Sequence, residues 1–164
     1  MQSIDPKRKI IDRNRAGKVS EEMKKSGRVL VFTNGCFDLI HPGHVDLLVR
    51  ARAFGDALMV GLNTDDSVRR LKGESRPVRN QYERSFVLAA LEAVDWVILF
   101  DEDTPFELLK IVKPSILVKG GDYTHDTVVG ADFVESYGGH IEILPLVSGY
   151  STSALLEKLK AICE

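Results

Sequence analysis

Hydrophobic and polar positions along the chain follow two alternating patterns. Short continuous apolar runs are typical of strands buried on both faces of a sheet, and apolar residues at helical spacing are typical of helices packed on that sheet. The first pattern predicts five strands, at residues 28–33, 57–63, 95–100, 115–119 and 140–145. Because helical segments separate these strands, the pattern predicts an α/β fold with a doubly wound, parallel, five-stranded sheet.

Capping and helix-breaking residues suggest where the helices begin and end. They predict helices at 19–25, from Pro42 to Gly55, after a Thr64 cap, at 81–93, after a Thr104 cap with Pro105 in the first turn, at 128–137 and at 151–162. Segments 70–79 and 119–123 are predicted loops, because glycine, proline, serine and charged residues dominate them.

Length and charge limit the possible classes of protein. The 164 residues suit one domain, here predicted at 28–164, after a leader and short helix at 1–27. A net charge of −2 gives no overall attraction to nucleic acid or to an anionic membrane, so neither is expected as a partner. No apolar stretch approaches the roughly 18 residues needed to span a bilayer. The two cysteines, Cys36 and Cys163, suggest no disulfide framework. A cytoplasmic protein is therefore expected.

The first eighteen residues are locally basic, with six lysines and arginines against two aspartates. One interpretation is an arm that binds nucleic acid. A solvated leader or an extension that packs on the domain is favoured for so short a run.

The string TNGCFDLIHPGH at residues 33–44 carries the strongest chemical signal. It joins a predicted strand to a predicted helix, whose first turn has free N–H groups and a positive dipole end. His41 and His44 add donors on one face, Gly35 and Gly43 permit close approach, and Pro42 suits the first turn. The pattern predicts a phosphate cradle. A zinc-site fragment is the weaker alternative, because the chain offers no third and fourth ligand at metal spacing.

Other polar loops follow the ends of predicted strands. In a doubly wound sheet, ligands bind beyond these carboxyl ends, where the strand order reverses. The loops are 33–44, 63–66, 119–123 and 145–153. The hydroxyl run Ser151–Thr152–Ser153, after Gly149, suits both a helix cap and a phosphate or ribose cradle.

Placed on a strand-to-helix junction, HPGH resembles the HxGH signature of the cytidylyltransferase-like nucleotidyltransferases, which have a Rossmann-like fold. Within that family, the chain is most similar to the branch that adenylylates D-glycero-β-D-manno-heptose 1-phosphate for lipopolysaccharide synthesis. The similarity is carried by TNGCFDLIHPGH (33–44), RRLKGESRPV (69–78), LEAVDWVILFDEDTP (91–105), LVKGGDY (117–123) and GYSTS (149–153).

The resemblance implies a role for each group of residues. Catalytic roles are implied for His41, His44 and Lys72. Nucleotide binding is implied for Thr33, Asn34, Gly35, Cys36, Phe37, Gly43, Arg84, Gly149, Ser151, Thr152 and Ser153. Substrate binding is implied for Lys119, Gly120, Gly121 and Asp122. The expected ligands are ATP, a sugar 1-phosphate and Mg²⁺, and the expected assembly is a homodimer. Asp38 is interpreted as an acid that orders the motif loop rather than as a base, and for Arg84 a surface salt bridge is an equal alternative.

One departure from the family pattern separates the alternatives. The glycerol-phosphate cytidylyltransferases carry an arginine shortly before the glycine that corresponds to Gly149, and this chain has none there. A cytidylyltransferase for a small alcohol phosphate such as glycerol 3-phosphate is therefore the second hypothesis. A nucleotide-sensing protein without activity and a zinc hydrolase are weaker alternatives. In many bacteria the heptose activity is fused to a sugar kinase, for which 164 residues leave no room, so the stand-alone form is expected.

Overall fold

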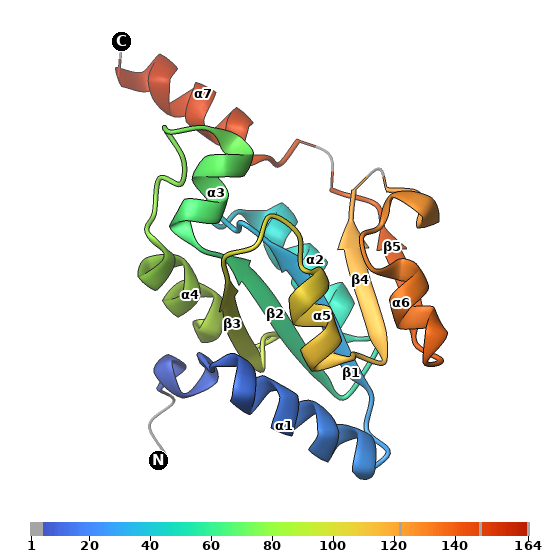
Figure 1. Ribbon diagram of the computed structural model, residues 1–164. Helices are drawn as coiled ribbons and strands as arrows, with labels where there is room; N and C mark the ends of the chain where they lie inside the picture. The colour runs from blue at the N-terminus through green and yellow to red at the C-terminus, as the bar shows by residue number, and fades with distance from the viewer. Residues whose placement is uncertain (1–4, 122, 148, 164) are drawn as a thin grey trace.

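A five-stranded parallel sheet forms the centre of the computed structural model, which describes residues 5–121, 123–147 and 149–163 (Figure 1). The strands are β1 (Leu30–Gly35), β2 (Ala57–Asn63), β3 (Trp96–Phe100), β4 (Ile116–Gly120) and β5 (His140–Leu144). Their order is β3-β2-β1-β4-β5, and every neighbouring pair is parallel. This confirms the predicted doubly wound sheet. The strand order reverses between β1 and β4, which places a ligand site beyond the carboxyl ends of these two strands.

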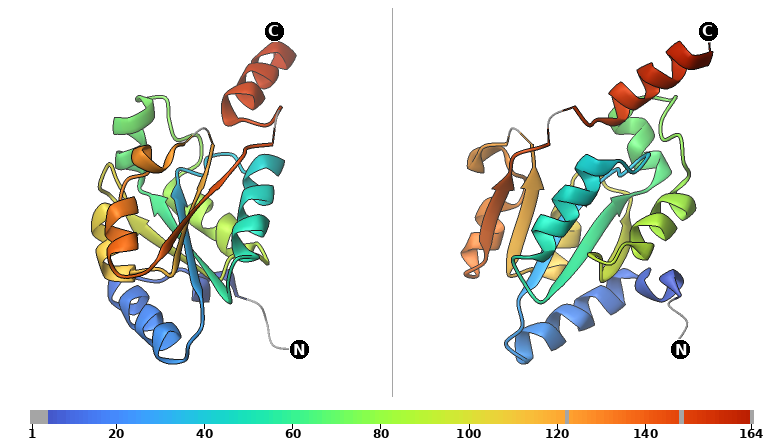
Figure 2. Two further views of the ribbon diagram at one scale, coloured as in Figure 1. Left: turned by 90° about the vertical axis from the view of Figure 1, so that its right-hand side faces the viewer. Right: turned by 180° about the vertical axis from the view of Figure 1, so that it is seen from behind.

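Helices cover both faces of the sheet. The α-helices are α1 (Arg13–Lys25), α2 (Pro42–Arg52), α3 (Asp65–Lys72), α4 (Gln81–Ala90), α5 (Phe106–Val112), α6 (Ala131–Ser136) and α7 (Thr152–Cys163), with short 3₁₀ helices η1 (Pro6–Lys9) and η2 (His125–Thr127). Seen along the sheet edge, α2 lies on the opposite side of the strands from α5 and α6 (Figure 2). Helix α7 lies beyond the carboxyl ends of the strands, and α1 lies at the other end of the molecule (Figures 1 and 2).

Alternate residues of each strand serve the two layers, because successive side chains point to opposite faces. In β2, Met59 belongs to the core shared with α1, α5 and α6, whereas Leu58 and Val60 belong to the core shared with α2 and α4. All seven residues of β2 are buried. The continuous apolar run in the sequence therefore reflects a central strand covered on both sides.

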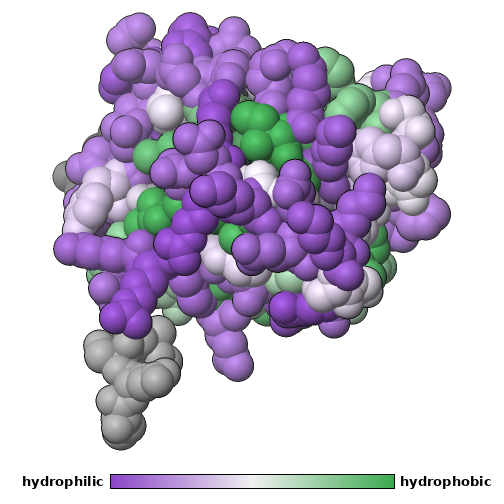
Figure 3. Space-filling model, turned by 60° about the horizontal axis from the view of Figure 1, so that its bottom comes forward, coloured by the Kyte–Doolittle hydropathy of each residue, from purple (hydrophilic) through white to green (hydrophobic). Residues whose placement is uncertain are grey.

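The N-terminal segment packs on the domain. Ile10 forms a parallel bridge with Val97 of the edge strand β3, and Ile11 is buried. In α1, Ala16 and Met23 are buried in the core that α5 shares. These contacts support the interpretation of the N-terminal segment as an extension that packs on the domain. The face around α1 is mostly hydrophilic (Figure 3).

Several predicted boundaries are wrong, each for a physical reason. Helix α1 begins at Arg13 rather than at residue 19, because Asp12 caps it by accepting a hydrogen bond from the Arg15 N–H at 2.8 Å. Helix α3 continues through Lys72, so the predicted loop 70–79 starts only at Gly73, whose positive φ of 95° ends the helix.

Three more boundaries shift in the second half of the chain. Thr104 does not cap α5, since Pro105 holds the cap position without a side-chain hydrogen bond. The helix predicted at 128–137 shortens to α6, because Gly130 has a positive φ of 87° just before it. Helix α4 ends at Ala90 instead of residue 93. In the described part of the chain, no helix is long and apolar enough to cross a membrane.

Candidate functional site

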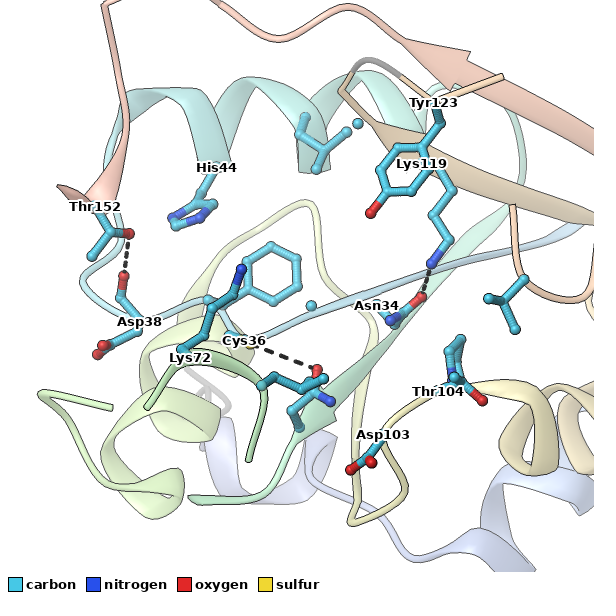
Figure 4. Close-up of a pocket in the computed structure, with 18 of the residues that line it drawn as sticks. Asn34, Cys36, Asp38, His44, Lys72, Asp103, Thr104, Lys119, Tyr123 and Thr152 are labelled. Atoms are coloured by element: carbon cyan, nitrogen blue, oxygen red, sulfur yellow. Dashed lines mark hydrogen bonds between the residues drawn. The ribbon is translucent and has the colours of Figure 1, made fainter. Parts of the chain in front are cut away.

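A cleft of about 590 Å³ opens at the carboxyl ends of β1, β2 and β4. This volume lies within the range of small-molecule sites. Among the predicted site residues, those that line the cleft are Asn34, Gly35, Cys36, Phe37, His44, Lys72, Lys119, Gly120, Thr152 and Ser153. Figure 4 shows two groups facing this space, with Thr152, Asp38, His44 and Lys72 on one side and Lys119 and Tyr123 on the other. The reversal of strand order brings these distant segments together.

The HPGH motif starts α2. His41 is the cap residue, and its Nδ1 accepts the backbone N–H of His44 at 3.4 Å, while Pro42 is the first helical residue. The two imidazole rings stack with centroids 3.7 Å apart. Gly43 permits this packing, because a Cβ there would lie 3.2 Å from the His41 ring and from Tyr150. The glycine therefore serves the geometry of the histidine pair.

His44 is the histidine that reaches the cleft. Burial lowers its pKa to about 4, with a smaller contribution from the charge of His41, so the ring is neutral near pH 7. Its Nδ1 is buried without a hydrogen-bond partner among the described residues. His41 lies on the far side of the pair and lines a separate shallow surface with Val45 and Val49. Of the two stacked histidines, His44 therefore faces the cleft, and His41 faces the shallow surface on its other side.

Asp38 orders the motif loop, as the sequence predicted. Its side chain is fully buried and accepts hydrogen bonds from Arg76 Nε at 2.8 Å, from the Val78 N–H at 2.8 Å and from the Arg79 N–H at 3.1 Å. Its backbone oxygen accepts the Thr152 hydroxyl at 2.9 Å. One residue thus joins the motif loop, the segment before α4 and the start of α7.

The same loop contains strained backbone. Phe37 and Leu39, on either side of Asp38, have positive φ values of 43° and 53°. Non-glycine residues avoid this region, and it persists where surrounding contacts hold it. The buried Phe37 ring lies 5.2 Å from the His44 ring, so the strained loop sets the wall behind that histidine.

Lys119 lies across the cleft from the histidines, at the end of β4. It is 8% exposed, and its ammonium donates a hydrogen bond to Asn34 Oδ1 at the end of β1. Burial lowers the pKa of Lys119 to about 8. Lys119 and Gly120 belong to the strand rather than to the predicted loop, so the backbone of the sheet fixes them. A buried ammonium at a strand end is a fixed point of attachment for an anion.

Lys72 contributes a second ammonium to the cleft. It is the last residue of α3, and is exposed. It therefore extends from a helix end instead of from a loop.

Cys36 also lines the cleft. Its thiol lies 4.0 Å from Asn63 Oδ1, and burial raises the pKa of this thiol. Cys36 is thus a cleft wall with little thiolate character at neutral pH.

Arg84 does not reach the cleft. Its side chain is 1% exposed, and its guanidinium donates to the backbone oxygens of Arg79 and Cys36 and to Asp65. The structure therefore supports the salt-bridge alternative, here buried, and not a nucleotide contact. By holding the Cys36 carbonyl, Arg84 positions the motif loop from behind.

The remaining predicted residues lie beside the cleft or are not described. Thr33 and Gly43 are buried behind its wall. Ser151 precedes α7 and accepts the Ala154 N–H at 3.1 Å, which is a capping contact. Gly149 and Gly121 have positive φ values of 84° and 131° and form turns. Asp122 lies outside the described residues.

Sequence reasoning missed Arg76, Asp103, Thr104 and Thr127 as residues that line the cleft, and it included Asn63 and Tyr123 only as members of the loops 63–66 and 119–123. Asp103 and Thr104 follow the end of β3, and that position was the available signal. Arg76 had no such signal, because it follows a helix and reaches the cleft only through tertiary contacts.

Comparisons with known proteins identify the family of this chain. The family model described as cytidylyltransferase-like matches residues 32–146. The chain belongs to the cytidylyltransferase-like family. It is 56% identical over 141 residues to the bifunctional protein HldE of Syntrophotalea carbinolica, covering 86% of this chain and 29% of that protein. The chain spans less than a third of the length of the curated relatives it matches.

Two solved structures have a similar fold. A lipopolysaccharide core biosynthesis protein from Thermoplasma volcanium superposes with a TM-score of 0.59 at 28% identity, covering 76% of this chain and all of that one. Pantoate-beta-alanine ligase from Francisella tularensis superposes with a TM-score of 0.61 at 16% identity, covering 92% and 76%. The second likeness concerns the fold alone.

Proposed function

We propose that this chain transfers AMP from ATP to D-glycero-β-D-manno-heptose 1-phosphate, giving ADP-heptose and pyrophosphate. The observation that carries the proposal is the cleft with cationic or donor groups on both sides, His44 and Lys72 facing Lys119, in a cytidylyltransferase-like chain. The segments 69–78, 91–105 and 117–123, which resemble the heptose branch, contribute Lys72, Arg76, Asp103 and Lys119 to that cleft.

The reaction needs alignment more than covalent help from the protein. An oxygen of the sugar phosphate attacks the α-phosphorus of ATP, the bond to the β-phosphate oxygen breaks, and pyrophosphate leaves. The acceptor phosphate is already ionised, so no base is required. This agrees with the structural role of Asp38, whose carboxylate is occupied by three protein donors.

The two sides of the cleft have different tasks in this proposal. On one side, His44 as a neutral donor and the Lys72 ammonium stabilise charge on the triphosphate. On the other side, Lys119, held by Asn34, binds the phosphate of the sugar. Thr152 and Ser153 at the start of α7 line the nucleotide side.

A divalent ion, Mg²⁺, fits this cleft as a companion of the phosphates. Among the described residues, no group of three or more His, Cys, Asp or Glu side chains is placed to hold a metal ion. Asp103, the exposed carboxylate of the cleft lining, already accepts a hydrogen bond from Arg70 Nε at 2.8 Å, so phosphate oxygens and water would supply most ligands of the ion. When bound, Mg²⁺ neutralises phosphate charge.

We also propose that the protein is a homodimer in the cytoplasm. Light scattering that reports a monomer at all concentrations would refute the homodimer.

The deciding assay measures pyrophosphate release with ATP or CTP and a panel of sugar 1-phosphates and glycerol 3-phosphate. The expected result is the highest kcat/KM for ATP with D-glycero-β-D-manno-heptose 1-phosphate. A higher value for CTP with glycerol 3-phosphate would refute the heptose substrate but leave nucleotidyl transfer intact. Nucleotide binding by calorimetry without turnover on any acceptor would instead indicate a nucleotide sensor.

A further inference from the structure

Arg76 lines the cleft without a role in the site described so far. It lies between α3 and α4, and its side chain is 17% exposed. Its Nε donates a hydrogen bond of 2.8 Å to Asp38 Oδ2, and the Asp38 side chain is fully buried. One edge of the guanidinium is therefore fixed to a carboxylate that does not move easily.

The other edge of the guanidinium is open. An arginine has five N–H donors, of which the Nε contact uses one. The described residues offer no acceptor within hydrogen-bond distance to Nη1 or Nη2 of Arg76. The Nη atoms are not among the fully buried, unpartnered side-chain atoms of the described residues, so they keep access to solvent, and Arg76 is one of the residues that line the cleft.

The position of Arg76 tells which ligand group it would meet. Asp38, to which Arg76 is fixed, bonds through its backbone oxygen to Thr152 at the start of α7. Asp38 and Thr152 lie on the same side of the cleft as His44 and Lys72 (Figure 4). Lys119 lies on the other side, so Arg76 belongs with the nucleotide group and not with the acceptor group.

We propose that Arg76 binds the phosphate chain of the nucleoside triphosphate through its Nη fork, while Asp38 holds its Nε edge. This inference rests on the proposed function, since it assigns the nucleotide to the side of His44. A planar fork fixed at one edge matches two phosphate oxygens with little further loss of side-chain freedom. Asp38 then has two effects, because it orders the motif loop and also orients the two Nη atoms of Arg76 toward the phosphates.

The test compares Arg76→Ala and Arg76→Lys with wild type by isothermal titration with three probes: ATP with Mg²⁺, inorganic tripolyphosphate and adenosine. Arg79→Ala is the matched control, because Arg79 is also an arginine of this segment but its side chain is 60% exposed and pairs with Glu83. Arg76→Ala is expected to weaken ATP and tripolyphosphate roughly 10- to 100-fold, the loss of one or two charge-assisted hydrogen bonds. Adenosine affinity should stay unchanged, and Arg79→Ala should bind all three like wild type.

Arg76→Lys separates recognition from mere structural support. A lysine has a single nitrogen and cannot hold Asp38 and fork a phosphate at once, so ATP affinity should fall several-fold with adenosine affinity retained. If Arg76→Ala does not fold, the affinities of Arg76→Lys alone test the inference. The inference is overturned if ATP and tripolyphosphate bind the folded variants like wild type, if all three probes weaken in parallel, or if wild type binds neither phosphate probe. If ATP and tripolyphosphate bind tightly but no AMP is transferred to any sugar phosphate, the proposed function is refuted, whereas the assignment of Arg76 to phosphate binding stands.

Discussion

Replacing Asp38 with asparagine should destabilise the protein strongly, although the two side chains have nearly the same shape. The carboxylate accepts three hydrogen bonds, from Arg76 Nε, the Val78 N–H and the Arg79 N–H. Asparagine has one acceptor oxygen, and its NH₂ group would face N–H donors that now bond to a carboxylate oxygen. The substitution also removes the counter-charge of Arg76, whose side chain is only 17% exposed.

The size of the effect follows from these contacts. Breaking a buried ion pair by removing one partner costs about 3–5 kcal/mol, and the lower end applies because Arg76 keeps some contact with solvent. With a urea m-value of about 2 kcal/mol per M, a loss of about 3 kcal/mol lowers the unfolding midpoint by about 1.5 M. The corresponding fall in Tm is about 6–12 °C for a chain of this size.

Equilibrium urea unfolding followed by circular dichroism measures this change. Asp46→Asn is the control, because Asp46 is 40% exposed and pairs with Arg50 one turn along α2 at 3.3 Å. Such a surface pair contributes about 0.5 kcal/mol or less. If Asp38→Asn unfolds within about 0.5 kcal/mol of wild type at an unchanged m-value, the junction role of Asp38 is refuted.

Three further results are expected. His44→Ala should lower kcat on the order of 100-fold or more, with a smaller loss of ATP affinity and a weaker effect for His41→Ala, because donors aimed at developing charge act on the transition state. Near-normal turnover by both folded variants in steady-state kinetics would contradict the phosphate cradle. Nuclear magnetic resonance titration should show the His44 ring titrating near pH 4, whereas the exposed His125, bonded to Glu135, has its pKa raised. Titration of His44 above pH 6 would show that burial does not govern it. Affinity for the sugar phosphate should fall as pH rises through about 8, because Lys119 then loses its proton and its charge. Lys119→Gln should bind weakly without this pH dependence, and a flat wild-type profile to pH 9 would argue against Lys119 as the anion receptor.

Features encoded by neighbouring residues could be predicted from the sequence. The bounds of β2, the Thr64 cap and the start of α2 at Pro42 agree with the structure, because apolar runs, capping side chains and proline act within a few residues of the chain. The alternation of strands and helices then determined the parallel sheet and the edge at which the cleft opens. HPGH predicts a phosphate cradle from the same kind of local signal, and this stays a prediction.

Tertiary structure alone decided which polar groups face the cleft and which support it. Arg84 and Arg76 are both arginines near α4, yet one is buried among three protein acceptors and the other presents an open fork. Lys119 and Asn34 meet across 85 positions of sequence, and Asp38 and Arg76 across 38. Such pairs depend on how strands are ordered and loops are folded back. The sequence by itself determined the elements and the chemistry available, whereas packing determined the burial, partners and charge state of each group, because these depend on contacts between segments that no local pattern records.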